Sequence, residues 1–262
     1  MLKELVNYVL NVLMTYISHM ENNKQFVLNK ILNTEVSEEP WKHLIIKDFL
    51  PNSLYDGVKN EVSFYIDNPA LKRKNVAACR IFVNKSMDVM PDTPNLLEYY
   101  NILLDQSITN AIKEKLSVSF ASAFYPKAQH PKDFYSELNL FTQGYNYGEV
   151  HSDTSPKSWE QTKAITMLHY LAEEGDDESL GTFLYTPHED GSKLDVFKDK
   201  VTSAPYISNC VLLFAPYDSN DFKTNHCMAN NSDKTFLRTS FQTFWMKKKK
   251  DWTKDQSSKI KL

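Results

Sequence analysis

Two histidines and one aspartate in this sequence have the residue types and the spacing of a metal site. His151 and Asp153 are separated by one residue, and His226 follows much later in the chain. Residues two apart in an extended segment point to the same side, so His151 and Asp153 can bind one ion together. Another strand of a closed sheet can bring His226 beside them. Two imidazoles and one carboxylate on one face leave three coordination positions open, as is typical of non-haem Fe(II) sites.

An arginine follows the second histidine within a β-prone, apolar run. Arg238 comes shortly after His226, in the sequence FLRTSFQTFW. An unpaired guanidinium is costly to bury in such surroundings, and its planar fork of donors suits a carboxylate. We therefore expect Arg238 to bind a carboxylate, and a structural ion pair within the protein is the alternative.

Short β-prone runs separated by turn residues must position these side chains. They begin at about residue 117 and fall at 117–124, 134–143, 146–153, 163–172, 181–186, 206–215 and 235–246. Seven or eight short strands over this length favour a sandwich, a barrel or a jelly roll.

The first half of the chain has the patterns of helices with two short strands. We expect one or two helices over 1–34, a strand over 43–50, a helix over 53–66, a strand over 79–84 and helical spacing over 94–116. The sequence thus predicts one α+β domain. It has a helical extension over 1–34, a mixed support over 40–116, a β core over 117–246 and a basic tail over 247–262.

The N-terminal helix is predicted to be amphipathic. A polar stripe lies opposite an apolar one: Glu4, Asn7, Asn11, Thr15 and Ser18 against Leu2, Leu5, Val6, Val9, Leu13 and Ile17. We expect the apolar face to pack on the core or on a partner. The uncharged run over 5–19 is shorter than the roughly 20 residues that span a bilayer, and Glu4 does not suit a signal peptide. We therefore expect a soluble, cytoplasmic protein with no membrane partner.

Composition excludes several classes of function. There are 6 glycines among 262 residues, none in a GxG pair and none leading into GK[ST], so Rossmann and Walker phosphate loops are absent from the sequence. A formal net charge of −3 disfavours nucleic acid as a partner. Three scattered cysteines without CxxC spacing fit a reducing compartment.

The order of these motifs resembles the Fe(II)/2-oxoglutarate-dependent dioxygenases, in their prolyl-hydroxylase-like and small-molecule hydroxylase branch. Members have an HxD motif, a distant histidine and an arginine shortly after it. The segments HSDTSPKSWEQTKAITMLHYL, LGTFLY and NCVLLFAP are similar to strands around the family's metal site, with Leu180 in place of a glycine. PWKHLIIKDFLPNSLYDGV is similar to its opening strand and helix, so the resemblance covers about residues 40–246.

The resemblance implies a double-stranded β-helix, a cupin-like jelly roll, buttressed by the N-terminal helices. It implies that His151, Asp153 and His226 bind Fe(II) as the catalytic centre and that Arg238 holds the far carboxylate of 2-oxoglutarate. Such an enzyme uses O2, with ascorbate in support, to hydroxylate an unactivated C–H, and it releases succinate and CO2. The carboxylate of Asp153 favours hydroxylation, because the family's radical halogenases have glycine or alanine there.

Further residues are candidates for binding the co-substrate or the substrate. Tyr145 and Tyr147 precede the HxD motif and could bind 2-oxoglutarate; the candidates for substrate are Arg80, Glu137, Asn139, His169 and Trp245. Glu137 would suit a cationic group and Arg80 a carboxylate. The family's free-amino-acid hydroxylases have an early arginine and a glutamate before the HxD motif at similar positions, and this resemblance implies a small polar substrate such as a free amino acid. An ordinary sheet position is the simpler reading for both tyrosines and for His169.

Three other functions remain open from the sequence. The enzyme could be prolyl-4-hydroxylase-like and act on a protein or peptide. The chain could be a jelly-roll binding protein that has lost catalysis, although loss of catalysis usually removes a ligand, and all are intact. A scaffold that docks through its N-terminal helix would leave the metal ligands unexplained. That helix permits a homodimer without requiring one.

Overall fold

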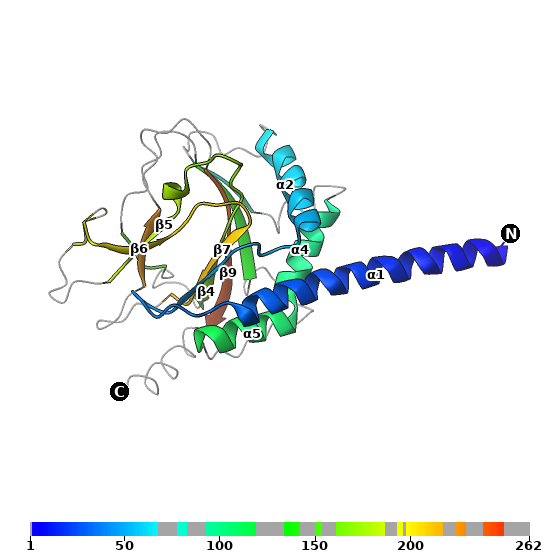
Figure 1. The fold of residues 1–262 in the computed structure, drawn as a ribbon, viewed down its shortest axis with the longest axis horizontal. Helices are drawn as coiled ribbons and strands as arrows, with labels where there is room; N and C mark the ends of the chain where they lie inside the picture. The colour runs from blue at the N-terminus through cyan, green and yellow to red at the C-terminus, as the bar shows by residue number, and fades with distance from the viewer. Residues whose placement is uncertain are drawn as a thin grey trace.

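Two antiparallel sheets and a set of helices form the part of the chain that the computed structural model describes (Figure 1). That part comprises residues 2–67, 78–82, 93–118, 134–141, 150–153, 161–186, 193–195, 198–216, 224–228 and 238–248. The helices are α1 (Leu2–Asn33), α2 (Asn52–Asp67), α4 (Pro94–Leu104) and α5 (Gln106–Leu116), with a short 3-10 helix at Glu178–Leu180.

The strands divide into a large and a small sheet. They are β1 (His43–Ile46), β2 (Ala78–Phe82), β3 (Phe134–Phe141), β4 (Gln161–Tyr170), β5 (Thr182–Tyr185), β6 (Lys200–Ala204), β7 (Cys210–Phe214), β8 (Asn225–Met228) and β9 (Arg238–Lys248). The large sheet has the order β1-β7-β4-β9-β3-β2, and the small sheet has the order β6-β5-β8. Neighbouring strands are antiparallel in both.

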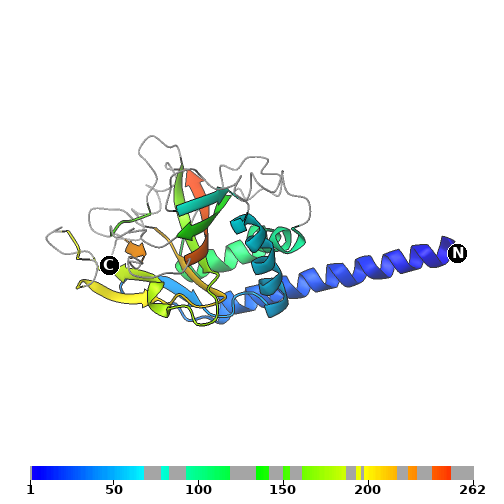
Figure 2. The same cartoon turned by 90° about the horizontal axis from the view of Figure 1, so that it is seen from above.

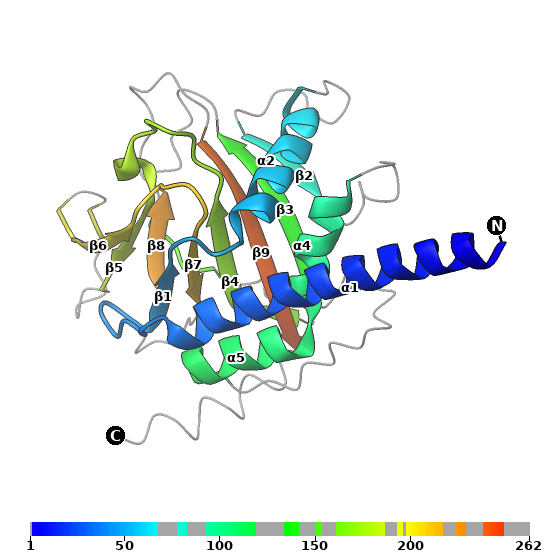
Figure 3. The same ribbon diagram turned by 45° about the vertical axis from the view of Figure 1, so that its right-hand side comes forward.

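The large sheet is the middle layer of the fold (Figures 1 and 3). The helices pack on one of its faces, where Ile165, Met167 and Phe241 join apolar side chains of α1, α2, α4 and α5 in one buried cluster. The small sheet covers the other face, where Leu168 and Leu212 join side chains of β5 and β6. Since both faces of β4 and β7 are covered, β7 is apolar throughout and β4 is mostly buried on both faces, although β4 also carries polar side chains such as Lys163 and Thr166.

The N-terminal helix differs from the sequence prediction. α1 forms as one helix, and near its C-terminal end Asn23, Val27 and Ile31 are buried against the body. Residues 3–18 are exposed, however, and this segment projects away from the domain (Figure 2). The expected packing of its apolar face on the core is therefore wrong, because the helix extends past α4 and α5. In the described residues we find no helix with the length and apolarity needed to cross a membrane.

The helical spacing over 94–116 corresponds to two helices. Asp105 ends α4 and begins α5, where its carboxylate accepts a hydrogen bond from Ser107 N at 2.8 Å, as an N-cap does. Glu61 of α2 caps α4 in the same sense, since its carboxylate accepts from the backbone nitrogens of Asn95 and Leu96 at 3.0 and 2.7 Å. The short polar side chain at Asp105 interrupts an otherwise continuous apolar period.

Most of the predicted strands are present, with shifted ends. β3, β4, β5, β7 and β9 correspond to predicted runs, whereas β6 and β8 were not predicted. β9 continues to Lys248 and so takes in the start of the predicted basic tail. Of the run 117–124, the described residues 117 and 118 form no strand. Of the run 146–153, the described part makes an isolated bridge at His151.

Candidate metal centre

His151 and His226 face each other across a short antiparallel bridge. His151 N donates to His226 O at 3.0 Å, and His226 N donates to His151 O at 2.9 Å. Residues that exchange both hydrogen bonds lie directly opposite each other, with their side chains on the same face. The ring centroids are accordingly 4.6 Å apart. The backbone of β8 thus brings together two histidines that are far apart in the sequence.

Asp153 lies two residues beyond His151, as the spacing predicts, and is 5% exposed. One carboxylate oxygen, Oδ2, is 3.7 Å from His226 Nε2 and accepts a hydrogen bond from Thr166 Oγ1 at 3.0 Å. The other, Oδ1, forms an ion pair with Lys163 Nζ at 2.8 Å. Both donors belong to β4 of the large sheet. Asp153 itself belongs to the segment that bridges to β8 of the small sheet, so contacts from the large sheet hold its carboxylate in place.

The protonation states of these groups suit a cation. Burial raises the pKa of Asp153, but the adjacent Lys163 ammonium and the two neighbouring histidines together outweigh it, and the pKa of the carboxyl is about 2. Burial lowers the pKa of His226 to about 4, so its imidazole is neutral at pH 7. Because the carbonyl of Thr224 can only accept, His226 Nδ1, 3.0 Å away, carries the ring proton. Nε2 is left unprotonated, as a metal ligand must be.

The three predicted ligands therefore form one cluster. Each of His151, Asp153 and His226 offers a ligand atom, and these atoms lie within 4.8 Å of one another. Two imidazoles and a carboxylate at this spacing fit a divalent transition metal. The chemistry of the donor set thus agrees with the Fe(II) site that the sequence resemblance implies.

Arg238 lies between the two sheets and is 3% exposed. Its Nε donates to Leu180 O at 2.7 Å, and its guanidinium carbon is 5.3 and 5.5 Å from the ring centroids of Tyr170 and Tyr206. Both rings belong to the core between the sheets. The phenyl ring of Phe214, in that same core, packs on His226 at 4.9 Å.

The register of β5 and β8 relates Arg238 to the metal ligands. Arg238 Nη2 is 3.5 Å from Thr182 Oγ1. Thr182 is two residues before Leu184, which lies opposite His226. At about 3.3 Å per residue, Arg238 therefore contacts β5 about 7 Å from the level of the histidine.

Two of the substrate candidates are on the wrong face of the large sheet. His169 contacts Tyr99 of α4, with Nδ1 3.1 Å from the tyrosine hydroxyl, and its other ring nitrogen is 3.3 Å from Asn209 Oδ1. Trp245 is buried in the cluster that joins this face to the helices. Alternation along β4 and β9 turns these side chains away from the metal ligands, so a substrate role for either is a wrong prediction. The simpler reading of His169, a satisfied sheet histidine, agrees with its contacts.

The remaining candidates are placed only by their backbone, or not at all. Arg80 of β2 lies opposite Asn139 of β3, and Asn139 lies opposite Ser240 of β9. Glu137 lies opposite Gln242. Tyr145 and Tyr147 are outside the described residues.

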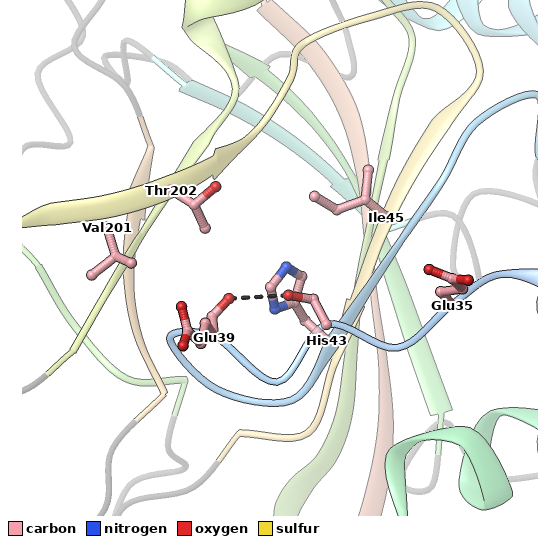
Figure 4. Close-up of a pocket in the computed structure, with 7 residues that line it drawn as sticks. Glu35, Glu39, His43, Ile45, Val201 and Thr202 are labelled. Atoms are coloured by element: carbon pink, nitrogen blue, oxygen red, sulfur yellow. Dashed lines mark hydrogen bonds between the residues drawn. The ribbon is translucent and has the colours of Figure 1, made fainter.

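A pocket of about 400 Å³ lies at another place, where β1 faces β6 (Figure 4). Glu35, Glu39 and His43 are among the residues around it, together with Val201 and Thr202. It includes none of the metal ligands, so it is separate from the candidate site.

Lys163 and Thr166 are site residues that the sequence reasoning missed. A lysine inside the β-forming run TKAITMLHYL was the available signal, because a charged residue in a covered strand needs a partner. Their direction toward Asp153 depends on the local geometry of β4, which the sequence pattern does not reveal.

Comparison with known proteins finds similarity in structure but not in sequence. Neither a family model nor a curated protein matches the sequence. A prolyl 4-hydroxylase from Phytophthora capsici superposes with a TM-score of 0.55 at 14% identity, over 87% of this chain and 66% of that one. This chain thus spans just under two thirds of the Phytophthora protein. A prolyl-4-hydroxylase from Pseudomonas putida gives 0.51 at 15% identity, over 85% of this chain and 97% of that one. This chain thus shares the mixed helix and sheet fold of these two prolyl 4-hydroxylases, which agrees with the sequence resemblance at the level of fold.

Proposed function

We propose that this protein is an Fe(II)- and 2-oxoglutarate-dependent oxygenase that hydroxylates an unactivated C–H bond of a small polar substrate. The convergence of His151, Asp153 and His226, with Asp153 ionised and His226 neutral, is the observation that carries the proposal. The shared fold with prolyl 4-hydroxylases supports it.

In this proposal the two histidines and Asp153 would hold Fe(II). When bound, the iron would supply the oxidising chemistry by which the substrate C–H, 2-oxoglutarate and O2 become a hydroxylated product, succinate and CO2, with one oxygen atom of O2 in the product and the other in succinate. The protein's part is positioning. The backbone bridge fixes the two imidazoles, the Thr224 carbonyl fixes the tautomer of His226, and Thr166 orients the carboxylate. Apolar packing by Phe214 limits the access of water on one side.

Arg238 is the proposed anchor for the far carboxylate of 2-oxoglutarate. A five-carbon dicarboxylate can bridge the distance of about 7 Å along β5 between the metal ligands and the guanidinium. The buried guanidinium, flanked by Tyr170 and Tyr206, would bind that carboxylate strongly, because little water competes for it. The carboxylate would in turn lower the cost of keeping this charge buried.

The sheet order supports a jelly-roll core. If the segment that contains His151 is counted as a strand beside β8, the small sheet has four strands, β6-β5-β8 and this one. Four strands of the large sheet, β7-β4-β9-β3, then form its counterpart. We propose that these eight strands are the double-stranded β-helix.

A free amino acid is the proposed substrate class. Arg80 and Asn139 lie in one row across the large sheet, and Glu137 is two residues from Asn139. A cation and an anion at neighbouring positions would match the carboxylate and the amino group of such a substrate. The second candidate is a prolyl residue of a peptide, which the fold shared with prolyl 4-hydroxylases supports.

The test is direct. The full chain is incubated with Fe(II), ascorbate and 2-oxoglutarate, alone and with a panel of amino acids and proline-containing peptides. Succinate should form, and mass spectrometry should find one substrate that gains one oxygen atom. Asp153→Ala should reduce succinate release to background, because the site loses its only carboxylate in the triad. Equal turnover by that variant would refute the proposal, and the panel separates the two substrate classes.

A further inference from the structure

The strand that supports the metal centre carries a bulge beside it. In the pairing of β4 with β9, Lys163 lies opposite Met246 and Ile165 lies opposite Trp245, so Ala164 is an extra residue. In a regular strand, residues three apart point to opposite faces. One extra residue reverses the alternation, as β-bulges near active sites commonly do. Lys163 and Thr166 consequently reach the same carboxylate, that of Asp153.

The Lys163 ammonium is held firmly in that position. It forms its ion pair with Asp153 Oδ1 at 2.8 Å, with side-chain exposures of only 14% and 6% for the lysine and the aspartate. The same nitrogen lies 3.9 Å from the ring centroid of Phe244, an arrangement that attracts a cation. A poorly hydrated ammonium therefore shares the carboxylate that a metal ion would need.

We propose that Lys163 is an internal competitor of the metal ion: it neutralises Asp153 in the metal-free protein and lowers the affinity of the triad for divalent cations. The inference rests on the proposed function, because it assumes that the triad is the metal site. Lys163 binds Oδ1 of Asp153, whereas Oδ2 faces His226. A metal ion bound to Oδ2 would therefore share this carboxylate with the ammonium, and the two positive charges would repel each other. In a partly buried site such repulsion is strong, since little solvent screens it.

Lys163 stabilises the metal-free protein. A buried carboxylate without a counter-charge is destabilising, and the lysine supplies that charge. A metal ion that binds the triad then replaces the Lys163 ammonium as the counter-charge of Asp153. The triad retains the ion only when the free energy of metal binding exceeds that of the ion pair between Lys163 and Asp153. Replacing Lys163 with an uncharged side chain of similar length should therefore strengthen metal binding.

The experiment measures Mn(II) binding by the full chain, without turnover. Metal-free protein is titrated with Mn(II), and free Mn(II) is followed by electron paramagnetic resonance. The wild type is compared with Lys163→Met, Lys163→Gln, Asp153→Asn and the matched control Lys200→Met. Lys200 also lies over an aromatic ring, that of Phe183, at 4.4 Å, but at the exposed start of β6. Its loss changes the net charge equally without touching the triad.

Both Lys163 variants should bind Mn(II) at least about tenfold more tightly than wild type, while Lys200→Met stays within about threefold. Their metal-free forms should melt at lower temperature, because Asp153 loses its counter-charge, and Mn(II) should raise the melting temperature more than in wild type. Far-UV circular dichroism checks that each variant is folded. If only one of the two Lys163 variants folds, that variant alone tests the proposal.

Two results would overturn the proposal, and only the second would also overturn the proposed function. Equal or weaker Mn(II) binding in the folded Lys163 variants, with binding lost in Asp153→Asn, removes the competitor role and leaves the proposed function intact. Wild-type binding that survives in Asp153→Asn, or no binding by any form, means that the triad does not hold the ion, and the proposed function fails as well.

Discussion

The buried His169 should make this protein sensitive to mild acid. Its side chain is 0% exposed. One ring nitrogen faces the Asn209 amide oxygen, which can only accept, so that nitrogen carries the proton and Nδ1 accepts from the Tyr99 hydroxyl. Burial lowers the pKa of His169 from 6.5 to about 3. A base whose pKa is lower in the folded chain binds fewer protons when folded, so the stability it permits at neutral pH is lost as the pH falls below 6.5.

The magnitude follows from these two values. Between pH 6.5 and about 3, the free energy of unfolding should fall by about 1.4 kcal/mol per pH unit on account of this residue. From pH 7.5 to 4.5 the loss is about 2.5 kcal/mol, a large fraction of the roughly 5–15 kcal/mol that is usual for a folded domain. Other buried histidines act in the same direction, so the test compares variants.

His169→Gln offers an amide donor and acceptor in place of the two ring nitrogens, loses the ring's packing on Phe49 and Tyr99, and removes the titration. Urea unfolding of metal-free wild type and variant, followed by far-UV circular dichroism at pH 7.5, 6.5, 5.5 and 4.5, gives both pH profiles. The variant should be less stable at pH 7.5 by about 1–3 kcal/mol, but its loss toward pH 4.5 should be smaller than that of wild type by about 2.5 kcal/mol. Parallel profiles would show that His169 is not protonated on unfolding in this range, and would refute the reasoning.

Three further changes test other parts of the structure. Gly181→Ala should cost at least about 2 kcal/mol of unfolding free energy in urea titrations, because a Cβ there would lie 1.7 Å from the Ala204 carbonyl oxygen; no loss would mean that β5 and β6 can separate freely. Glu61→Gln should lower stability by about 1 kcal/mol in thermal melts, because the cap of α4 loses its charge; an unchanged melting temperature would contradict that role. Arg238→Lys should raise the KM for 2-oxoglutarate at least about tenfold in succinate assays and leave Mn(II) affinity within about threefold, since lysine lacks the planar fork; an unchanged KM would exclude Arg238 as the anchor.

Spacing alone predicts the core of the candidate metal site. Residues two apart in extended chain share a side, so His151 and Asp153 can be paired without a structure. The order of the motifs identifies His226 as the third candidate ligand, and a strand is expected to carry it. The bounds of that strand, β8, escape prediction because four residues are too few to display a period. The sequence identifies β4 as a strand but does not distinguish its two faces, since apolar residues cover both.

The missed features depend on contacts between distant segments. The bulge at Ala164 depends on how β4 pairs with β9, so the sequence does not reveal the direction of Lys163. The packing of His169 on α4 requires knowledge of which face the helices cover. The apolar stripe of α1 is plain in the sequence. Amphipathicity predicts which face of the helix is apolar, but it does not predict whether the domain extends far enough along the helix to bury that face.

The bridge between His151 and His226 has a consequence for the order of folding. It closes a long loop that contains β4, β5, β6 and β7. Bringing residues so far apart in the chain together costs loop-closure entropy, which the strands inside the loop must offset. The candidate ligands are therefore apart until this loop closes. Metal affinity at the candidate site should appear only once these strands have folded, which makes a bound ion a reporter of that closure.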